Sequence, residues 1–487
     1  MLEAHAHQQL KALLVQEGAE VWPHHLSLSR LVGRSLRRGD HSLIRLAVGS
    51  SPNWWISLLV PLALSEQPLA LVVSDPLRQR LLQVELPRLQ RAGLALACGE
   101  GPEPPPAGML WLLNHGELVT AWQQQRLGGR QLILPEAEQL EALLRQALAV
   151  TIEPRHWDQL RRAAPSAAST VLGLHERLSR RVLAAPTNPA GTVALSDDDE
   201  APLRHLLALL RPLPSPWQTW LDAADGAWTS WASVDTALLQ WTLQRQPLEP
   251  LSAIAGLLAG RGAIVIGQLG AQRHDGQELP TPALTLGLRP QVDVALGEPP
   301  LADPLPLYAP LRQPLPNSPI YGEHLLEQSR RLVLGQEGLT LVLADDDQLL
   351  RQLTSALAAD FGSRVVHQCT APESNGVLCA SWSWWLEQQQ RLPLANQIIV
   401  ALLPISSLED PLTAARVAKL RSQGRDWFRE LLLPDALLRL QLGVAGLRRQ
   451  QGARLAVLDG RLRGRSWGQR VLQSLEPWIS LNRLLPS

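Results

Sequence analysis

Short apolar runs alternate with amphipathic stretches through the first 150 residues. The runs Ser42–Leu46, Leu69–Asp75 and Met109–His115 are bounded by turn residues, as is typical of buried strands. Stretches with helical spacing of apolar positions follow them, such as PLRQRLLQVELPRLQRAG and EAEQLEALLRQAL. Because strands that alternate with helices form parallel sheets covered by helices, the pattern predicts an α/β fold.

The pattern changes at about residue 151. The next stretch is helix-like and rich in tryptophan, and an acidic loop, SDDDEAP, interrupts it, so we expect an inserted α-helical domain. Strand character returns in AIVIGQLG, and a proline-rich connector then runs to Tyr321. The expected organisation is a first α/β domain at 1–150, the helical insert at 151–245, a return to the first domain with the connector at 246–321, and a second α/β domain at 322–487.

Composition narrows the classes of function. The 487 residues, 45% of them hydrophobic, suffice for several domains with cores of their own. Because 45 basic and 45 acidic residues cancel, attraction to nucleic acid has to come from local patches. The cysteines Cys98, Cys369 and Cys379 are scattered, which supports neither a disulfide framework nor a thiolate metal site. The apolar runs are too short to span a bilayer and the N-terminus lacks a signal core, so we expect a cytoplasmic protein without a membrane partner.

The stretch AVGSSPNWWISLLVP, residues 47–61, joins an expected strand to an apolar helix. A loop that cradles phosphate would lie at such a junction, since helix N-termini bind anions. Lysine, however, occurs only at Lys11 and Lys419, and both lie in helical stretches. No lysine can therefore act as the phosphate-binding lysine of a P-loop.

The segment from Leu403 to Arg461 carries the most recognisable motifs. It runs from LLPISSLEDP through FRELLLPDALLRLQLGVAGLRR to AVLDGR. In order and spacing it resembles the last motifs of DinG/XPD-type superfamily-two DNA helicases. The stretches LYAPLRQPLPNSPIY, LWLLNHGELV and LILPEAEQLE resemble further segments of that family in the same order. The resemblance implies two RecA-like parallel-sheet domains, with an inserted α-helical domain in the first, and an ATP-dependent activity on DNA.

The chain departs from this family first at the nucleotide loop. The family's A-G-T-G-T-G-K-S loop corresponds to VGSSPNWW, residues 48–55. Trp54 takes the place of the lysine, Trp55 replaces the hydroxyl that holds Mg²⁺, and Pro52 lacks an N–H donor. The loop equivalents are Gly49, Ser50, Ser51, Asn53, Trp54 and Trp55. The position matches a nucleotide loop, but the side chains cannot neutralise a triphosphate.

Other catalytic motifs are altered as well. The family's D-E-A-H corresponds to Pro135–Glu138, so that Glu136 stands at the water-orienting acid without the metal-binding aspartate. Glu136 and Glu138 also suit the first turn of a helix, where the dipole favours acids. The T-S-A-T-type motif corresponds to Gly267–Ala271 and lacks hydroxyls. Between the first two motifs stands only Cys98, which excludes the family's iron–sulfur cluster.

The last helicase motif is only partly retained. Its Q-G-x-G-R-x-I-R corresponds to Leu442–Arg449, in which Gly446 replaces the first arginine and Arg449 remains. We therefore treat Glu136 and Arg449 as remnants of catalytic positions. Arg448 and Arg449 are also candidates for contact with phosphate or a partner, or a solvated pair at a helix end.

Tryptophan and local charge provide further candidates for nucleic-acid contact. The 17 tryptophans include the cluster SWSWW, and Trp382, Trp384 and Trp385 could stack on bases or fill the core in place of phenylalanine. We interpret the cluster as lying on a strand, where neighbouring side chains face opposite sides. From Pro411 to Arg470, thirteen basic residues face four acids. Such an excess fits a surface that tracks phosphates, and equally a solvated helical domain.

Three hypotheses follow. The leading one is a DinG-like helicase homologue that binds single-stranded or duplex DNA and lacks ATP hydrolysis, with no cofactor. The first alternative is an active helicase, which would require ATP and Mg²⁺. The second is a scaffold that kept the fold and binds a protein partner.

Overall fold

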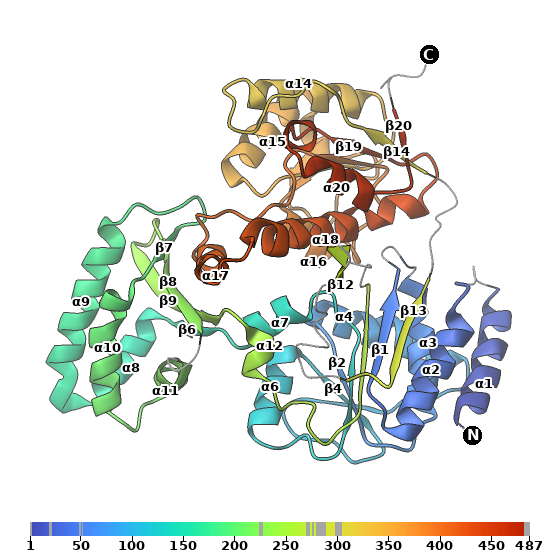
Figure 1. The fold of residues 1–487 in the computed structure, drawn as a ribbon, viewed down its shortest axis with the longest axis horizontal. Coiled ribbons are helices and arrows are strands. Elements are labelled where there is room, and N and C mark those ends of the chain that lie inside the picture. The colour runs from blue at the N-terminus through green and yellow to red at the C-terminus, as the bar shows by residue number, and fades with distance from the viewer. Residues whose placement is uncertain are drawn as a thin grey trace. The chain divides into compact units, whose positions relative to one another are not determined.

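Two seven-stranded parallel sheets organise the computed structural model (Figure 1). The structure describes residues 2–18, 22–47, 50, 52–223, 227–268, 273–274, 277–278, 289–297 and 304–481. The chain divides into two compact units. Unit 1 comprises Met1–Glu298 and Leu408–Ala418, and unit 2 comprises Pro299–Ser407 and Lys419–Ser487. Among the helices that are described, none combines the length and apolarity needed to cross a bilayer.

The sheet of unit 1 has the order β13-β1-β10-β5-β2-β4-β3, and all its pairings are parallel. Its strands are β13 (Val292–Leu296), β1 (Ser42–Leu46), β10 (Ala263–Gly267), β5 (Gln131–Leu134), β2 (Leu69–Val72), β4 (Leu110–Leu113) and β3 (Cys98–Glu100). The β1 bounds match the sequence prediction. The central strands are buried on both faces, which explains why they read as continuous apolar runs.

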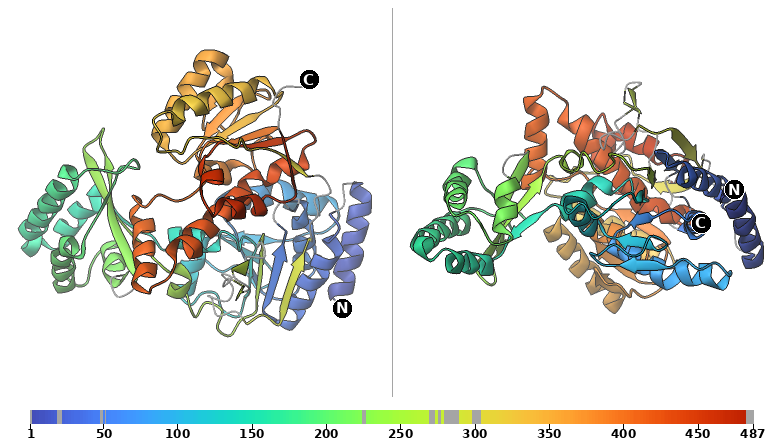
Figure 2. Two further views of the ribbon diagram at one scale, coloured as in Figure 1. Left: turned by 45° about the horizontal axis from the view of Figure 1, so that its top comes forward. Right: turned by 90° about the horizontal axis from the view of Figure 1, so that it is seen from below.

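Helices cover both faces of this sheet (Figure 2). They are α1 (Leu2–Glu17), α2 (His25–Arg38), α3 (Trp55–Ala63), α4 (Asp75–Arg80), α5 (Leu86–Arg91), α6 (His115–Gln123), α7 (Leu140–Ala147) and α12 (Pro250–Ala253). Successive residues of a strand point to opposite faces of the sheet. Ile44 belongs to the core beneath α1–α3, whereas its neighbour Leu43 belongs to the core beneath α6, α7 and α12.

The inserted segment contains the expected helices and also a sheet that the sequence interpretation lacked. The helices are α8 (Pro154–Ala163), α9 (Ala168–Ala184), α10 (Asp197–Leu209) and α11 (Trp217–Asp222). The antiparallel strands, in sheet order, are β6 (Val150–Ile152), β9 (Gln240–Pro247), β8 (Trp228–Asp235) and β7 (Thr192–Ala194). The acidic stretch is not a loop. Ser196 caps α10, and the acids form its first turn, where the helix dipole favours negative charge.

The sheet of unit 2 has the order β16-β17-β15-β18-β19-β14-β20 and is also entirely parallel. Its strands are β16 (Val365–His367), β17 (Val377–Ala380), β15 (Thr340–Leu343), β18 (Gln397–Val400), β19 (Arg454–Val457), β14 (Leu305–Tyr308) and β20 (Trp478–Ser480). Its helices are α14 (Tyr321–Leu334), α15 (Asp347–Phe361), α16 (Trp382–Gln388), α18 (Leu433–Val444), α19 (Arg461–Gly464) and α20 (Gly468–Ser474).

One helix begins in a segment that belongs to unit 1. Helix α17 (Pro411–Ser422) follows directly on Asp410, and residues Leu408–Ala418 cluster with unit 1. Two contacts hold this segment there: Asn188 Nδ2 donates to the carbonyl oxygen of Glu409 at 2.8 Å, and Arg416 pairs with Glu141 at 3.1 Å. The chain therefore passes between the units three times.

Candidate nucleotide site

The loop after β1 occupies the junction between the sheet and α3. Ala47 N–H donates to Leu296 O at 3.0 Å, which ties the end of β1 to β13. The N–H and the hydroxyl of Ser50 both donate to Ala47 O, at 3.1 and 2.7 Å. Ser50 is therefore engaged in closing the turn. The predicted loop residues Gly49 and Ser51 lie outside the described residues.

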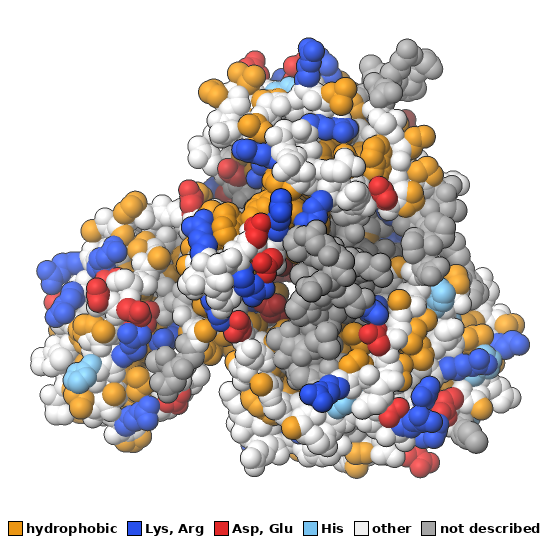
Figure 3. Space-filling view, in the orientation of Figure 1, with side chains coloured by type: hydrophobic (Ala, Val, Ile, Leu, Met, Phe, Trp, Pro, Cys, Tyr) orange, Lys and Arg blue, Asp and Glu red, His pale blue; other side chains and the backbone are white. Residues whose placement is uncertain are grey.

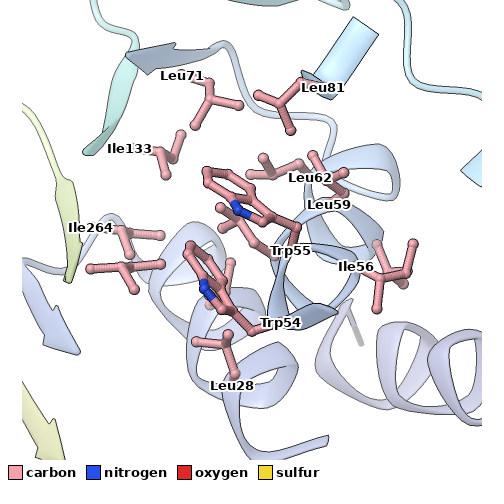
Figure 4. Close-up of a cluster of buried hydrophobic side chains, with 14 of the residues drawn as sticks. Leu28, Trp54, Trp55, Ile56, Leu59, Leu62, Leu71, Leu81, Ile133 and Ile264 are labelled. Atoms are coloured by element: carbon pink, nitrogen blue, oxygen red, sulfur yellow. The ribbon is translucent and has the colours of Figure 1, made fainter. Parts of the chain in front are cut away.

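Trp54 and Trp55 are part of the core of unit 1. Their side chains are only 6% and 3% exposed, and their rings stack with centroids 4.3 Å apart and an interplanar angle of 23°. Figure 4 shows both indoles among aliphatic side chains, including Leu28, Ile133 and Ile264. The positions that should carry a cation and a metal-binding hydroxyl are thus filled by buried apolar rings.

Helix α3 is apolar on every side. Its residues from Trp55 to Leu62 are all buried. Ser57 is the polar side chain of this run, and its hydroxyl lies 2.6 Å from His25 Nδ1. Burial lowers the pKa of His25 to about 4, so the imidazole is neutral near pH 7. Asn53 is half-buried and has a partner of its own.

Glu136 follows β5 and reaches across to the end of the neighbouring strand β2. Its carboxylate accepts from the N–H of Ser74 at 2.6 Å and from the Ser74 hydroxyl at 2.8 Å. Burial raises the pKa of this carboxyl, and the two hydrogen bonds oppose that rise. Both carboxylate oxygens therefore bind Ser74 at the start of α4. Glu136 thus has a structural role, because it links the end of β5 to the start of this helix.

Glu138 forms a similar link between β5 and β10. Its Oε2 accepts from the N–H of Gln268 at 2.9 Å. A side chain at Gly267 would place a Cβ 2.5 Å from this oxygen, so glycine is required there. Burial raises the pKa of Glu138 to about 7, and the charge of Glu136 adds to that rise. Sequence reasoning missed Ser74 and Gln268 as partners, because both donors lie far from these acids along the chain.

The residues present do not fit ATP·Mg²⁺. Proline stands at the metal-binding aspartate and indoles stand at the lysine and hydroxyl positions, so the triphosphate and the metal would both lack their usual ligands. In the part of the chain that the structure describes, no group of three or more His, Cys, Asp or Glu is arranged to hold a metal ion.

Comparison with known proteins connects this altered site to a family, although no family model matches the chain. A stretch of 176 residues, 34% of this chain, is 30% identical to the ATP-dependent DNA helicase YoaA of Escherichia coli K12 and covers 28% of that protein. A stretch of 105 residues, 21% of this chain, is 34% identical to YoaA of Haemophilus influenzae and covers 16% of it. The matches thus span less than a third of these curated relatives.

Solved structures agree on the fold. S. tokodaii Xpd4 superposes with a TM-score of 0.59 over 92% of this chain and 98% of that chain, at 10% identity. An apo XPD structure gives 0.58 over 93% and 100%, at 11% identity. The chain is similar to DNA helicases of the DinG/XPD type, in sequence over about a third of its length and in fold over nearly all of it. The resemblance drawn from its motifs, and the fold it implied, are confirmed.

The tryptophan cluster of unit 2 is mainly core. SWSWW forms the start of α16 with Ser381 as its N-cap, not a strand. Trp382 and Trp385, one helical turn apart, are buried, and their indole N–H groups donate to Leu402 O and Gly443 O at 2.9 and 2.8 Å. They do not serve as base-stacking platforms in this structure, because no face of either ring is open. Trp384 is half-buried.

Arg448, predicted as a phosphate or partner contact, is used internally. Its guanidinium donates to the carbonyl oxygens of Pro477 at 3.0 Å and Glu476 at 3.3 Å, and also to that of Leu475. Burial lowers its pKa, although the group stays charged near pH 7. Arg448 thus holds the chain that follows α20. Arg449 is engaged as well.

Much of the basic excess counted in the sequence is neutralised within the fold. Among the described residues, at least five of the thirteen cations form ion pairs: Arg416, Arg425, Arg429, Arg439 and Arg461. Arg454 is buried against Gln397, and Arg421 lies over the ring of Trp427. Figure 3 shows Lys and Arg side chains next to Asp and Glu over α17 and α18. The C-terminal part of the chain is therefore less basic at its surface than its composition indicates.

Proposed function

We propose that this chain is a DinG/XPD-type helicase homologue that binds nucleic acid without hydrolysing ATP. The observation that carries the proposal is the buried stack of Trp54 and Trp55 at the phosphate-binding turn. Hydrolysis of a triphosphate depends almost entirely on electrostatic stabilisation and positioning. Neutral rings that face the core supply neither.

Nearby groups do not compensate. The closest cation along the chain, Arg45 on β1, pairs with Asp293 of β13 at 2.8 Å. Glu136, which would orient the attacking water, has both oxygens bound to Ser74. Gly446 stands where a helicase would provide an arginine for transition-state charge. The chain therefore lacks, at three separate positions, a free cation near the phosphates, an acid free to orient water and an arginine for the transition state.

The case for nucleic-acid binding rests on relationship and on exposed charge. The curated relatives carry the name DNA helicase, and the fold is that of XPD. Arg463 and Arg465 in unit 2 are exposed and belong to the basic segment that is not neutralised by the ion pairs above. We propose single-stranded or duplex DNA as the partner, recognised through its phosphates.

Isothermal titration with ATP and Mg²⁺, together with phosphate release in the presence of oligo-dT, tests the loss of hydrolysis. We expect no binding heat and no turnover. Binding of labelled oligo-dT by the same preparation serves as the control for a folded protein. Micromolar ATP binding with DNA-stimulated turnover would instead establish the active helicase.

A protein-binding scaffold is the second candidate, favoured by the internal use of Arg448 and of the ion-paired arginines. Fluorescence anisotropy with labelled single strands over a range of salt separates the two proposals. Nucleic-acid binding predicts an affinity that falls steeply with salt, because phosphate contacts release counterions. Absence of binding even at low salt would leave the scaffold.

A further inference from the structure

Unit 2 carries an open depression between two stretches that resemble helicase segments, LYAPLRQPLPNSPIY and AVLDGR, neither of which was assigned a ligand from the sequence. Its volume is about 540 Å³, within the range of small-molecule sites. The lining comes from three places in the chain: the loop 311–314, the start of α14 with Ile320 and His324, and the start of α19. The lining residues are Leu311, Arg312, Gln313, Pro314, Ile320, His324, Gly460, Arg463 and Gly464.

The loop before α14 and the start of α19 are in direct contact, so the depression has a fixed wall. A Cβ at Gly460 would lie 2.2 Å from Pro314 O, and one at Gly464 would lie 3.4 Å from a methyl carbon of Leu315. Behind them, Asp459 is fully buried and accepts from Leu403 N–H at 2.9 Å and from Arg461 N–H at 2.9 Å. The first turn of α19 is thus held in place before any ligand arrives.

The lining combines positive charge with unsatisfied polar atoms. Arg312 and Arg463 are exposed, and none of the described side chains forms an ion pair with either. His324 Nε2 and Gln313 Oε1 are buried atoms without a hydrogen-bond partner among the described residues. The other end of Gln313 is fixed, because its Nε2 donates to Val457 O at 3.0 Å. Such atoms favour a ligand that brings both acceptors and donors.

Two large apolar side chains flank the charges. Leu311 is 80% exposed and Ile320 is 62% exposed. An inorganic anion would use the arginines and leave these side chains in water, whereas a nucleotide has an apolar base face next to its phosphate. Guanidinium groups match phosphate oxygens well. No carboxylate belongs to the described lining, so nothing there opposes an anion.

We propose that this depression binds one nucleotide unit, with its phosphate on Arg312 and Arg463 and its base against Leu311 and Ile320. The inference rests on the proposed function, because the nucleotide would belong to the nucleic acid that the chain is proposed to bind. The depression lies far along the chain from Trp54 and Trp55. The ligand chemistry has two sources, a free nucleotide or a nucleotide within a single strand.

The test compares the full chain with the double variant Arg312→Gln/Arg463→Gln by anisotropy of labelled oligo-dT over a salt series. We expect roughly tenfold weaker binding at low salt, and a log–log salt slope smaller by about 0.7, since the site neutralises one phosphate and each neutralised single-strand phosphate contributes about 0.7. The matched control is Arg331→Gln/Arg351→Gln, which removes the same charge from exposed helix positions of unit 2 outside the depression. The control should bind within about twofold of the unmodified chain.

Each outcome has its own consequence. If the unmodified chain does not bind oligo-dT, the proposed function fails. If it binds and the depression variant binds equally well with the same slope, only the depression inference is overturned. Competition by dTMP, lost in the variant, identifies a free nucleotide as the source. If dTMP does not compete and the variant loses only oligo-dT binding, the ligand is a nucleotide within a single strand. Leu311→Ser should weaken oligo-dT binding and leave the salt slope unchanged, which a purely ionic surface would not show.

Discussion

Glu138 accepts a hydrogen bond from the main-chain N–H of Gln268 across the ends of β5 and β10. In a DEAH-type sequence this position would belong to the ATPase site, yet here the carboxyl is buried against Gly267 and links two strands. Its pKa, raised by burial from 4.5 to about 7, makes the contact sensitive to pH. Burial disfavours the ionised carboxylate here, so the folded state is most stable while the carboxyl keeps its proton.

The first prediction concerns this pH dependence. Between pH 4.5 and pH 7 the folded chain holds a proton on Glu138 that the unfolded chain has released. The contribution is complete below pH 4.5 and is lost as the pH rises towards 7, by about 3 kcal/mol in total. Glu138→Gln should flatten this part of the curve, measured by urea unfolding across that range. The exposed substitution Glu66→Gln is the control. Curves that stay parallel would contradict the assignment.

The second prediction concerns the tryptophan pair as core. Trp55→Ala should lower the unfolding free energy by about 3–5 kcal/mol, because the cavity left under the sheet cannot be refilled by its neighbours. Circular dichroism during denaturant unfolding measures the loss. Trp122→Ala removes a partly buried indole of the same unit and should cost less. An equal or smaller loss at Trp55 would argue against its placement in the core.

The third prediction concerns restoring the lysine. Trp54→Lys should give no ATP hydrolysis and should destabilise the chain by about 3 kcal/mol or more, since the ammonium would be buried without a partner. Phosphate release with Mg²⁺ and oligo-dT, together with thermal unfolding, measures both effects. Trp54→Phe keeps an apolar ring and should remain close to the parent stability. Turnover by the lysine variant would show that the loop still accommodates a triphosphate.

The fourth prediction separates Arg448 from a phosphate contact. Arg448→Gln leaves the carbonyl oxygens of Leu475 and Glu476 without this donor and removes one of two donors from that of Pro477, so it should cost about 1–3 kcal/mol of stability. At a temperature where the variant is folded, the salt slope of oligo-dT binding should be unchanged. A smaller slope would identify Arg448 as a contact to phosphate after all.

The alternating part of the fold could be predicted because each buried strand is a local apolar run. Ser42–Leu46 is a strand in both the prediction and the structure, and the strand-to-helix turn that follows lies where the motif comparison placed it. The same comparison identified Trp54 and Trp55 as substitutes for catalytic residues. That these rings face the core depends on packing with β5 and β10, which residue types alone do not specify.

Other features could not be predicted, because no short stretch of the sequence determines them. The strands β8 and β9 were hidden by the helical stretches around them, since their pairing is what stabilises them. SWSWW suits a strand by residue type, yet Ser381 caps it as a helix. The basic count overestimated the exposed charge, because Arg439 and Arg461 meet Asp345 and Asp459 only in the folded chain. The depression was missed because Arg312 and Arg463 are about 150 residues apart in sequence.

The stacked tryptophans also bear on how this chain can evolve. Domains of this size are stable by only about 5–15 kcal/mol, so a first step back towards a glycine- and lysine-containing loop would use up a large share of that margin. Several aliphatic neighbours would have to enlarge at the same time to refill the space. Each single step on that route therefore passes through a less stable protein, which disfavours a return to a glycine- and lysine-containing loop.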